Sequence, residues 1–503
     1  MVAIANNPRG GIRKDFEPSK TVDSEPPKLL LVPLHRCFLA VVLSLLIPMV
    51  IIAEGRPNIV FVLVDDLGWM DLGCYGHGWH DTPNIDRLAE HGVRFTDAYA
   101  PAPICTASRA SILTGNTVAR VGLEFVVKNE PGSQVIDPPQ ELKAPPITAG
   151  LELDEVTIAE HLQTAGYATA YFGKWHLNSH HKRYLGWSPS HGPDKQGFET
   201  AFEDFGSHPY SKKKLKSVSA AGRYHPDGIT ERAVSYLKQN RERPFFLMVS
   251  HFYVHTPIRS PYDWLKKKYV QLVPENSVRR RERVEYAAFV ETLDHHIGEL
   301  LAAIDDAELR QNTLVVFMSD NGGHPEYTSN QPLRGSKWNL YEGGIRVPLI
   351  ARWPSRIQSG IKSTAPVIGY DLFATFAAAA GQPAANSDGV DILALLENSV
   401  APVARPLFWH FPYYHPEGSK FGRAKPDIGV DDFVTSQTRP HSAIRHGDHK
   451  LIYFEEDGRT ELYDLRRDLS EQKNIQGSQA GMAANLKLEL LRHLNRVEAR
   501  RAK

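Results

Sequence analysis

The strongest hydrophobic pattern in the chain is a set of short, continuous runs of apolar, β-branched and aromatic residues. Runs of this length that do not alternate with polar positions are typical of strands buried on both faces of a sheet. There are four of them, at residues 58–66, 167–176, 244–257 and 313–323.

Between these runs, apolar residues recur at helical spacing, and an alanine-rich segment follows the last run. The pattern predicts helices at residues 82–92, 156–167, 228–240, 284–305 and 373–381. Because strands alternate with helices, we predict an α/β fold with a large, mostly parallel central sheet flanked by helices.

The pattern changes near residue 400. Residues 441–468 read as short strands joined by a hairpin turn at 455–459, which carries Asp-Gly, and residues 483–503 read as an amphipathic helix. We therefore predict a smaller C-terminal subdomain, an antiparallel sheet plus a helix, over residues 401–503, following an α/β domain over residues 54–400.

The N-terminus predicts export. Residues 1–36 are polar, with several prolines and basic residues, and residues 37–53 form an apolar run of 17 residues. A membrane-spanning helix needs about 20 apolar residues, so this run is more typical of the apolar region of a signal peptide. We predict that residues 1–53 are a leader and that the protein is periplasmic or extracellular. It would be anchored by residues 37–53 only if the leader is retained.

Charge and cysteine content narrow the function classes. The chain has 58 Lys plus Arg and 58 Asp plus Glu, so no global field attracts nucleic acid or an anionic membrane. Any anionic ligand must be held by local charges. Only Cys74 and Cys105 remain after the leader, which is not a disulfide framework. We predict Cys74 to be a buried apolar residue. The residues around Cys105 instead suggest that this cysteine takes part in a reaction.

Polar side chains capable of chemistry follow each of the four predicted strands. They are Asp65 and Asp66, Lys174 and His176, His255, and Asp320 and Asn321. Ligands of open α/β sheets bind at the carboxyl ends of the strands. Capping of helices and turns would account for any one Asp or Asn pair, but not for all four strands together.

The residue types indicate a metal ion and an anion. Carboxylate and amide oxygens without a thiolate suit Ca²⁺ or Mg²⁺ better than Zn²⁺, and the sequence has no zinc-type histidine spacing. The oxygen donors are Asp65, Asp66, Asp320 and Asn321. The groups that would supply positive charge and proton transfer to a bound anion are Lys174, His176, His255 and Lys337.

Several short motifs resemble those of a known family. They are CTASRASILTG at 105–115, GKWHL at 173–177, HTP at 255–257, DNGG at 320–323 and GSK at 335–337, preceded by the Asp pair after the first strand. In type and order these motifs are similar to those of type I, formylglycine-dependent sulfatases, arylsulfatase-like members of the alkaline phosphatase superfamily. The resemblance covers roughly residues 55–350. One departure is Ala107, where many members have proline, which leaves open the maturation enzyme that recognises the site.

The resemblance implies a mechanism. Cys105 would be oxidised to formylglycine by a maturation enzyme, and one hydroxyl of its hydrate would attack the sulfur of a sulfate ester. One Ca²⁺, or less readily Mg²⁺, would be bound by residue 105 together with Asp65, Asp66, Asp320 and Asn321. The helix N-terminus at Cys105 favours an anion, and Arg109 lies one turn away, where it can orient the diol.

The remaining roles also follow from the resemblance. Lys174 and Lys337 would stabilise charge, His255 and Lys337 would protonate the leaving alcohol, and His176 would deprotonate the second hydroxyl to expel sulfate. The expected substrate is a sulfated small molecule or glycan, because exported sulfatases commonly act on sulfated carbohydrates.

Two alternatives stay open at this stage. One is a phosphoester or phosphonate hydrolase of the same superfamily, and the other is a catalytically silent carbohydrate-binding homologue.

Two aromatic-rich segments bear on the substrate. Residues 179–217 could guide a polyanionic glycan or form a solvated loop. Residues 409–418 could stack on sugar rings or pack between the domains.

Overall fold

The computed structural model describes residues 55–503, apart from 128–131, 135–139, 213, 240–241, 385, 399–403 and 416–437. The predicted leader and the predicted domain boundary at residues 400 and 401 lie outside the described residues. Both sheets described below belong to one compact unit, Glu54–Lys503. Among the helices that the structure describes, none combines the length and apolar character needed to cross a membrane.

The four predicted strands form the middle of an eight-stranded sheet, in the order β5-β4-β6-β1-β7-β8-β2-β9. The predicted strands are β1 (Asn58–Val64), β4 (Ala168–Gly173), β6 (Phe245–Ser250) and β7 (Thr313–Ser319). The others are β2 (Val93–Phe95), β5 (Thr200–Phe202), β8 (Leu349–Arg352) and β9 (Ile361–Ser363). Every neighbouring pair is parallel except those that β8 makes with β7 and β2. The mostly parallel sheet is therefore confirmed.

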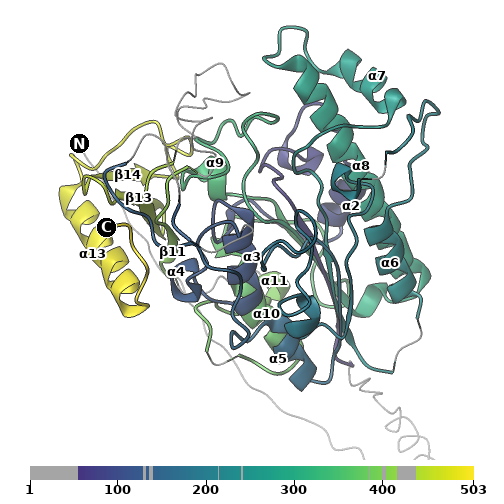
Figure 1. Ribbon diagram of the computed structural model, residues 1–503, viewed down its shortest axis with the longest axis horizontal. Helices are drawn as coiled ribbons and strands as arrows, with labels where there is room; N and C mark the ends of the chain where they lie inside the picture. The colour runs from purple at the N-terminus through teal and green to yellow at the C-terminus, as the bar shows by residue number, and fades with distance from the viewer. Residues whose placement is uncertain are drawn as a thin grey trace, which may run out of the picture. The chain divides into compact units, whose positions relative to one another are not determined.

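Both faces of this sheet are covered by helices, which explains why its strands are apolar at every position. Alternate residues of β1 enter two separate cores, Phe61 into one and Val62 into the other. The first core contains α3 (Cys105–Thr114), α5 (Ile158–Thr164), α10 (Asp371–Ala379) and α11 (Leu393–Asn398), and the second contains α2 (Pro83–Glu90), α6 (Gly228–Leu237) and α8 (Arg280–Asp306). Figure 1 shows these two groups of helices on either side of the sheet.

Two of the predicted helices begin at residues whose side chains cap them. Thr157 and Glu160 form a capping box at the start of α5, and the Asp227 carboxylate accepts a hydrogen bond from the Thr230 N–H at the start of α6. The smaller elements are α4 (Val118–Val121), α7 (Asp263–Leu272), α9 (Glu342–Ile345), β3 (Ala98–Tyr99) and β10 (Val367–Ile368). Four 3₁₀ turns lie at Gly73–Tyr75, Pro193–Lys195, Pro209–Ser211 and Arg310–Asn312.

The C-terminal residues form the predicted antiparallel sheet and helix. The strands are β11 (Leu407–Phe411), β12 (His441–His446), β13 (His449–Phe454) and β14 (Thr460–Asp464), in that order, with α13 (Ala480–Arg496) beside them. The turn between β13 and β14 contains the predicted Asp-Gly pair, with Gly458 at φ +69°. One face packs on α13 through Leu451 and Leu490, and the other packs on the α/β body, where Trp409 and Ala107 share a core.

The last helix is shorter than predicted. The amphipathic pattern predicts a helix to residue 503, but α13 ends at Arg496, and Glu498 adopts a left-handed φ of +53°. Tertiary contacts redirect the tail: Lys503 exchanges two backbone hydrogen bonds with Lys143, and the Arg500 guanidinium binds the buried Glu124 carboxylate. These contacts lie far away in sequence, so local periodicity does not reveal them.

The aromatic segment that starts within β11 packs in the interior at its beginning. Trp409 is buried and donates from its indole N–H to the Ala100 carbonyl at 2.8 Å. Tyr413 is also buried, and its ring stacks on Phe125 at 4.5 Å. Of the two alternatives for residues 409–418, packing between the domains holds for 409–415, and residues 416–418 lie outside the described part of the chain.

Candidate active site

The sheet brings the four polar strand ends together. Strands β4, β6, β1 and β7 are consecutive neighbours, and they end level with one another, because Gly173 pairs with Ser250 and Val64 pairs with Ser319. Hydrogen bonds continue past the last pairs, from the Lys174 N–H to the Ser250 carbonyl at 2.8 Å and from the Asp320 N–H to the Val64 carbonyl at 3.0 Å. The side chains that follow therefore start from one edge.

Backbone conformations with positive φ direct these side chains toward the site. Asp66 and His176 both have left-handed φ angles, 61° and 59°. Gly173 has φ +111°, and a Cβ there would lie 1.9 Å from the Ser250 carbonyl oxygen. Only glycine fits this close approach of two strands, which explains the glycine before the Lys174–His176 segment.

Cys105 is the first residue of α3. Its N-cap, Ile104, is extended and offers no side-chain cap, so the first N–H groups of the helix remain available to an anion. The Thr106 hydroxyl donates to the His176 carbonyl at 3.0 Å and joins this end of α3 to the segment after β4. Both described cysteines are free thiols, and Cys74 is only partly buried rather than a core residue as predicted.

Arg109 is fully buried one turn along α3 and organises the strand ends. Its Nε donates to the Asp320 carboxylate at 2.9 Å, and its Nη1 donates to the Ser250 hydroxyl at 2.6 Å and the Lys174 carbonyl at 3.0 Å. The guanidinium thus fixes one predicted metal-ligating carboxylate. Its predicted role toward residue 105 stays a prediction.

Two buried lysines pair with the aspartates after β1. The Lys174 Nζ lies 2.5 Å from Asp65 Oδ2, and the Lys337 Nζ lies 2.7 Å from Asp66 Oδ2 and 3.2 Å from His255 Nε2. Although burial disfavours the charge of Asp66, Lys337 and His255 hold the pKa of its carboxyl well below its usual range. Burial also opposes the charge of Lys337, but Asp66 raises its pKa above the ordinary value.

The acidic side chains fit a divalent cation. Ligand atoms of Asp65, Asp66, Cys105 and His255 lie within 4.8 Å of one another, and all four residues are buried. Asp65 Oδ1 and Asn321 Oδ1 are buried without a hydrogen-bond partner among the described residues. Unpaired oxygens at buried positions are costly unless a cation or water satisfies them, and hard oxygens are the donors that Ca²⁺ and Mg²⁺ prefer.

Asp320 and Asn321 border this group. The Asn321 Nδ2 donates to Asp66 Oδ1 at 2.8 Å, and Asp320 Oδ1 accepts from the Asp66 N–H at 3.2 Å. Burial and the nearby Asp65 raise the pKa of Asp320 to about 7. The crowding of carboxylates is thus only partly compensated by the arginine and lysines, which is consistent with an additional cation at the site.

The two predicted acid–base histidines differ in their surroundings. His176 is buried, its Nδ1 has no partner among the described residues, and burial together with Lys174 lowers its pKa well below the ordinary value. The His255 Nδ1 lies 2.5 Å from the Thr256 carbonyl oxygen, so it carries a proton and leaves Nε2 to face Lys337. Burial and Lys337 lower the pKa of His255 to about 3.

Some residues at the site are missed by the sequence patterns. Ser250 binds Arg109, yet nothing in the sequence distinguishes this serine at the end of a strand. The Tyr210 hydroxyl lies 3.1 Å from His255 Nδ1, and the ring of Tyr184 lies 5.3 Å from that of Tyr210. Both tyrosines come from the 179–217 segment, whose aromatic character was the available signal.

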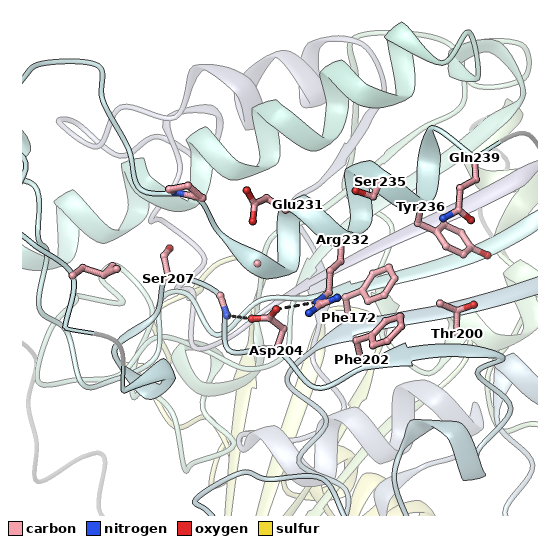
Figure 2. A pocket seen from close by; sticks show the side chains of 14 residues that line it. Phe172, Thr200, Phe202, Asp204, Ser207, Glu231, Arg232, Ser235, Tyr236 and Gln239 are labelled. Carbon is pink, nitrogen blue, oxygen red and sulfur yellow. Dashed lines mark hydrogen bonds and ion pairs between the residues drawn. The ribbon is translucent and has the colours of Figure 1, made fainter.

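A separate cavity of about 490 Å³ lies beside α6 and β5 (Figure 2). Phe172, Phe202 and Tyr236 contribute apolar wall, and the Arg232 guanidinium binds the Asp204 carboxylate across it. None of the predicted site residues lines this cavity, so it is distinct from the cluster around Cys105.

Comparison with known proteins agrees with this geometry. Residues 57–382 match the family model described as "Sulfatase", and residues 336–500 match the model described as "N-sulphoglucosamine sulphohydrolase, C-terminal". The chain is 33% identical to arylsulfatase A of Homo sapiens over 480 residues, which covers 88% of each protein. It is 31% identical to N-acetylgalactosamine-6-sulfatase of Canis lupus familiaris, covering 71% of this chain and 69% of the relative.

Solved structures give the same result. The crystal structure of Ps i-CgsB in complex with k-i-k-neocarrahexaose superposes with a TM-score of 0.67 and 26% sequence identity, covering 87% of this chain and 93% of the other. The resemblance first suggested by the motifs is thereby confirmed. The chain belongs to the sulfatase family, within the alkaline phosphatase superfamily, and it is a sulfuric ester hydrolase.

Proposed function

We propose that this sulfatase removes sulfate from a sulfated carbohydrate, that Cys105 acts after oxidation to formylglycine, and that the site binds one Ca²⁺. We further propose that the protein is exported before it acts and that a maturation enzyme modifies Cys105. The observation that carries the proposal is the position of Cys105. It is buried at an uncapped helix N-terminus, beside three carboxylates and two lysines that come from other parts of the chain.

Formylglycine at residue 105 would supply the nucleophile, and a bound cation would polarise the sulfate oxygens. Residues of the chain would hold both in place. Asp65, Asp66, Asp320 and Asn321 would hold the cation beside residue 105. Asp65 and Asp66 lie within reach of Cys105, and Asp320 and Asn321 contact Asp66. Arg109 keeps the Asp320 carboxylate in place through its 2.9 Å hydrogen bond. The amides at the start of α3 face the anion.

The lysines stabilise negative charge, and Lys337 and the histidines transfer protons. Lys174 and Lys337 carry positive charge in a site that excludes water, where charge stabilisation is strongest. The contact of Lys337 with His255 Nε2 at 3.2 Å lets this pair deliver a proton to the leaving oxygen. His176, with a buried and unpartnered Nδ1, is the group available to take the proton when sulfate is released.

A carbohydrate substrate is supported by the relatives and by the entrance to the site. The N-acetylgalactosamine-6-sulfatases and the neocarrahexaose complex both concern sugars by their names. In this chain, Tyr184 leaves 52% of its surface exposed, and its ring adjoins those of His180 and Tyr210. An exposed aromatic face beside a buried charged centre suits a sugar ring.

The reaction class is tested with a matched pair of esters. We expect the matured enzyme to hydrolyse an aryl sulfate with a kcat/KM at least ~10²-fold above that for the aryl phosphate with the same leaving group, because loss of a single matched donor already costs about 10². A higher kcat/KM for the phosphate would favour the phosphoesterase alternative.

The substrate is tested with a panel of sulfated mono- and oligosaccharides. The saccharides that release sulfate identify the substrate, and release from none of them would contradict the carbohydrate assignment.

A further inference from the structure

Helix α8 carries a second cluster of metal-ligating side chains, separate from the residues around Cys105. The His295 Nε2 lies 3.7 Å from Glu299 Oε1, and the His296 Nδ1 lies 3.0 Å from Glu299 Oε2. Ligand atoms of all three residues lie within 4.8 Å of one another. The spacing places Glu299 one helical turn after both histidines, where side chains meet.

The cluster opens into a cavity. A space of about 650 Å³ is lined by His295 and Glu299 together with Tyr224 and Asp227. The Tyr224 ring stacks on His295 at 3.8 Å with an angle of 9° between the planes, which fixes the imidazole. His295 and Glu299 are partly exposed, whereas His296 is completely buried. An ion can therefore enter from the cavity and reach a ring held in the interior.

The hydrogen bonds around His296 favour a cation between its ring and the Glu299 carboxylate. Ser207, labelled in Figure 2, places both its N–H and its hydroxyl on the Asp227 carboxylate, at 2.7 and 3.0 Å. Ser207 Oγ also lies 3.0 Å from the Tyr253 hydroxyl. With its own proton on the Asp227 carboxylate, Ser207 accepts from Tyr253 and from His296 Nε2, 3.4 Å away. In a neutral ring the His296 Nδ1 then turns a lone pair toward the Glu299 carboxylate. A metal ion between them removes this repulsion.

A neighbouring imidazole also lacks protein partners. His251 is completely buried, and neither of its ring nitrogens has a hydrogen-bond partner among the described residues. Its ring is nearly parallel to that of His296, with centroids 6.4 Å apart. The interior beside the cluster therefore contains imidazole nitrogens that no described residue hydrogen-bonds.

We propose that His295, His296 and Glu299 bind a Zn²⁺ ion, with the remaining position open to the cavity. Two imidazoles and one carboxylate are a known ligand set for zinc, and nitrogen and oxygen ligands at about 2.0–2.2 Å from a tetrahedral ion lie roughly 3.3–3.6 Å apart. The two separations to Glu299, 3.0 and 3.7 Å, lie close to that range, and the ligand atoms of His295 and His296 lie within 4.8 Å of each other. This site differs in kind from the oxygen-rich centre at Cys105, which suits Ca²⁺.

The proposal is tested by calorimetric titration of Zn²⁺ into the whole matured protein, with excess Ca²⁺ present to fill the oxygen-rich centre. One equivalent of Zn²⁺ is expected to bind. His295→Ala and Glu299→Gln should each weaken its binding by at least ~10–100-fold, the loss that follows even when only an outer partner of a metal ligand is removed. Co²⁺ in place of Zn²⁺ should give the visible absorption of a tetrahedral site in the parent protein but not in His295→Ala or Glu299→Gln.

Glu231→Gln is the matched control, because Glu231 lines the same cavity and its substitution removes the same charge. It should bind Zn²⁺ like the parent. Absence of a Zn²⁺ equivalent in the parent would show that the three side chains do not form a metal site. Equal binding by all four proteins would show an adventitious ion elsewhere. Either result overturns the proposal. Circular dichroism spectra in the absence of zinc verify that the variants are folded.

Discussion

Replacing Cys105 with serine is expected to abolish steady-state turnover while leaving transfer of sulfate to the enzyme possible. Hydrated formylglycine has two hydroxyl groups, one that attacks sulfur and one that expels the sulfate, whereas serine has only the first. The serine oxygen attacks sulfur, the alcohol leaves with a proton from the Lys337–His255 pair, and the sulfate stays on residue 105. We expect kcat to fall by about 10⁶-fold, as it does when a covalent nucleophile is lost in other hydrolases.

Intact-mass measurement after incubation with an aryl sulfate tests this directly. Cys105→Ser should gain the mass of one sulfate group and release one equivalent of alcohol at most. Cys74→Ser is the matched control, because Cys74 is a free, partly buried cysteine outside the site. It should turn over like the parent and gain no mass. Sustained multiple turnover by Cys105→Ser would mean that water attacks sulfur.

Removal of divalent cations is expected to stop catalysis, and Ca²⁺ is expected to restore it. A bound cation contributes several kcal/mol of charge stabilisation in the transition state, so exhaustive chelation should lower kcat/KM by about 10³-fold or more. The buried oxygens Asp65 Oδ1 and Asn321 Oδ1, which accept no hydrogen bond from the described residues, are the positions that Ca²⁺ would fill.

Two variants test whether the loss of activity on chelation arises at the oxygen-rich centre around Cys105. Asp65→Asn should raise the Ca²⁺ concentration needed for half-maximal activity, because it removes a charged ligand. Asp194→Asn makes the same substitution at an exposed position in the 3₁₀ turn Pro193–Lys195 and should leave that concentration unchanged. Full activity after chelation, or recovery with Zn²⁺ but not with Ca²⁺, would contradict the assignment of the ligands.

The cluster at the carboxyl edge of the sheet could be predicted because its residues directly follow strands that the local sequence pattern reveals. Asp65, Lys174 and Asp320 each follow an apolar strand directly, and parallel strands must end at the same edge of a sheet. Glycine at 173 and the cysteine at a helix start are also local signals. The family motifs contain these same positions, which is why the sequence alone brought together residues that the fold places side by side.

Other features depend on contacts far apart in sequence and could not be predicted. Strand β8 runs antiparallel to its neighbours, and no pattern in its four residues distinguishes it from a parallel strand. The end of α13 depends on Lys143 and Glu124, more than 300 residues away. The contacts of Arg109 with the Ser250 hydroxyl and the Asp320 carboxylate join positions more than 100 residues apart, so the sequence alone did not indicate them.

The most direct test of the account is peptide mass spectrometry of the enzyme in its active form. The peptide that contains residue 105 is expected to show the mass loss that results when the CH₂SH group of cysteine becomes CHO. The fraction of the modified peptide should rise in proportion to specific activity across preparations made with and without a competent maturation enzyme. An active preparation in which every copy of residue 105 is an unmodified cysteine thiol would contradict the account.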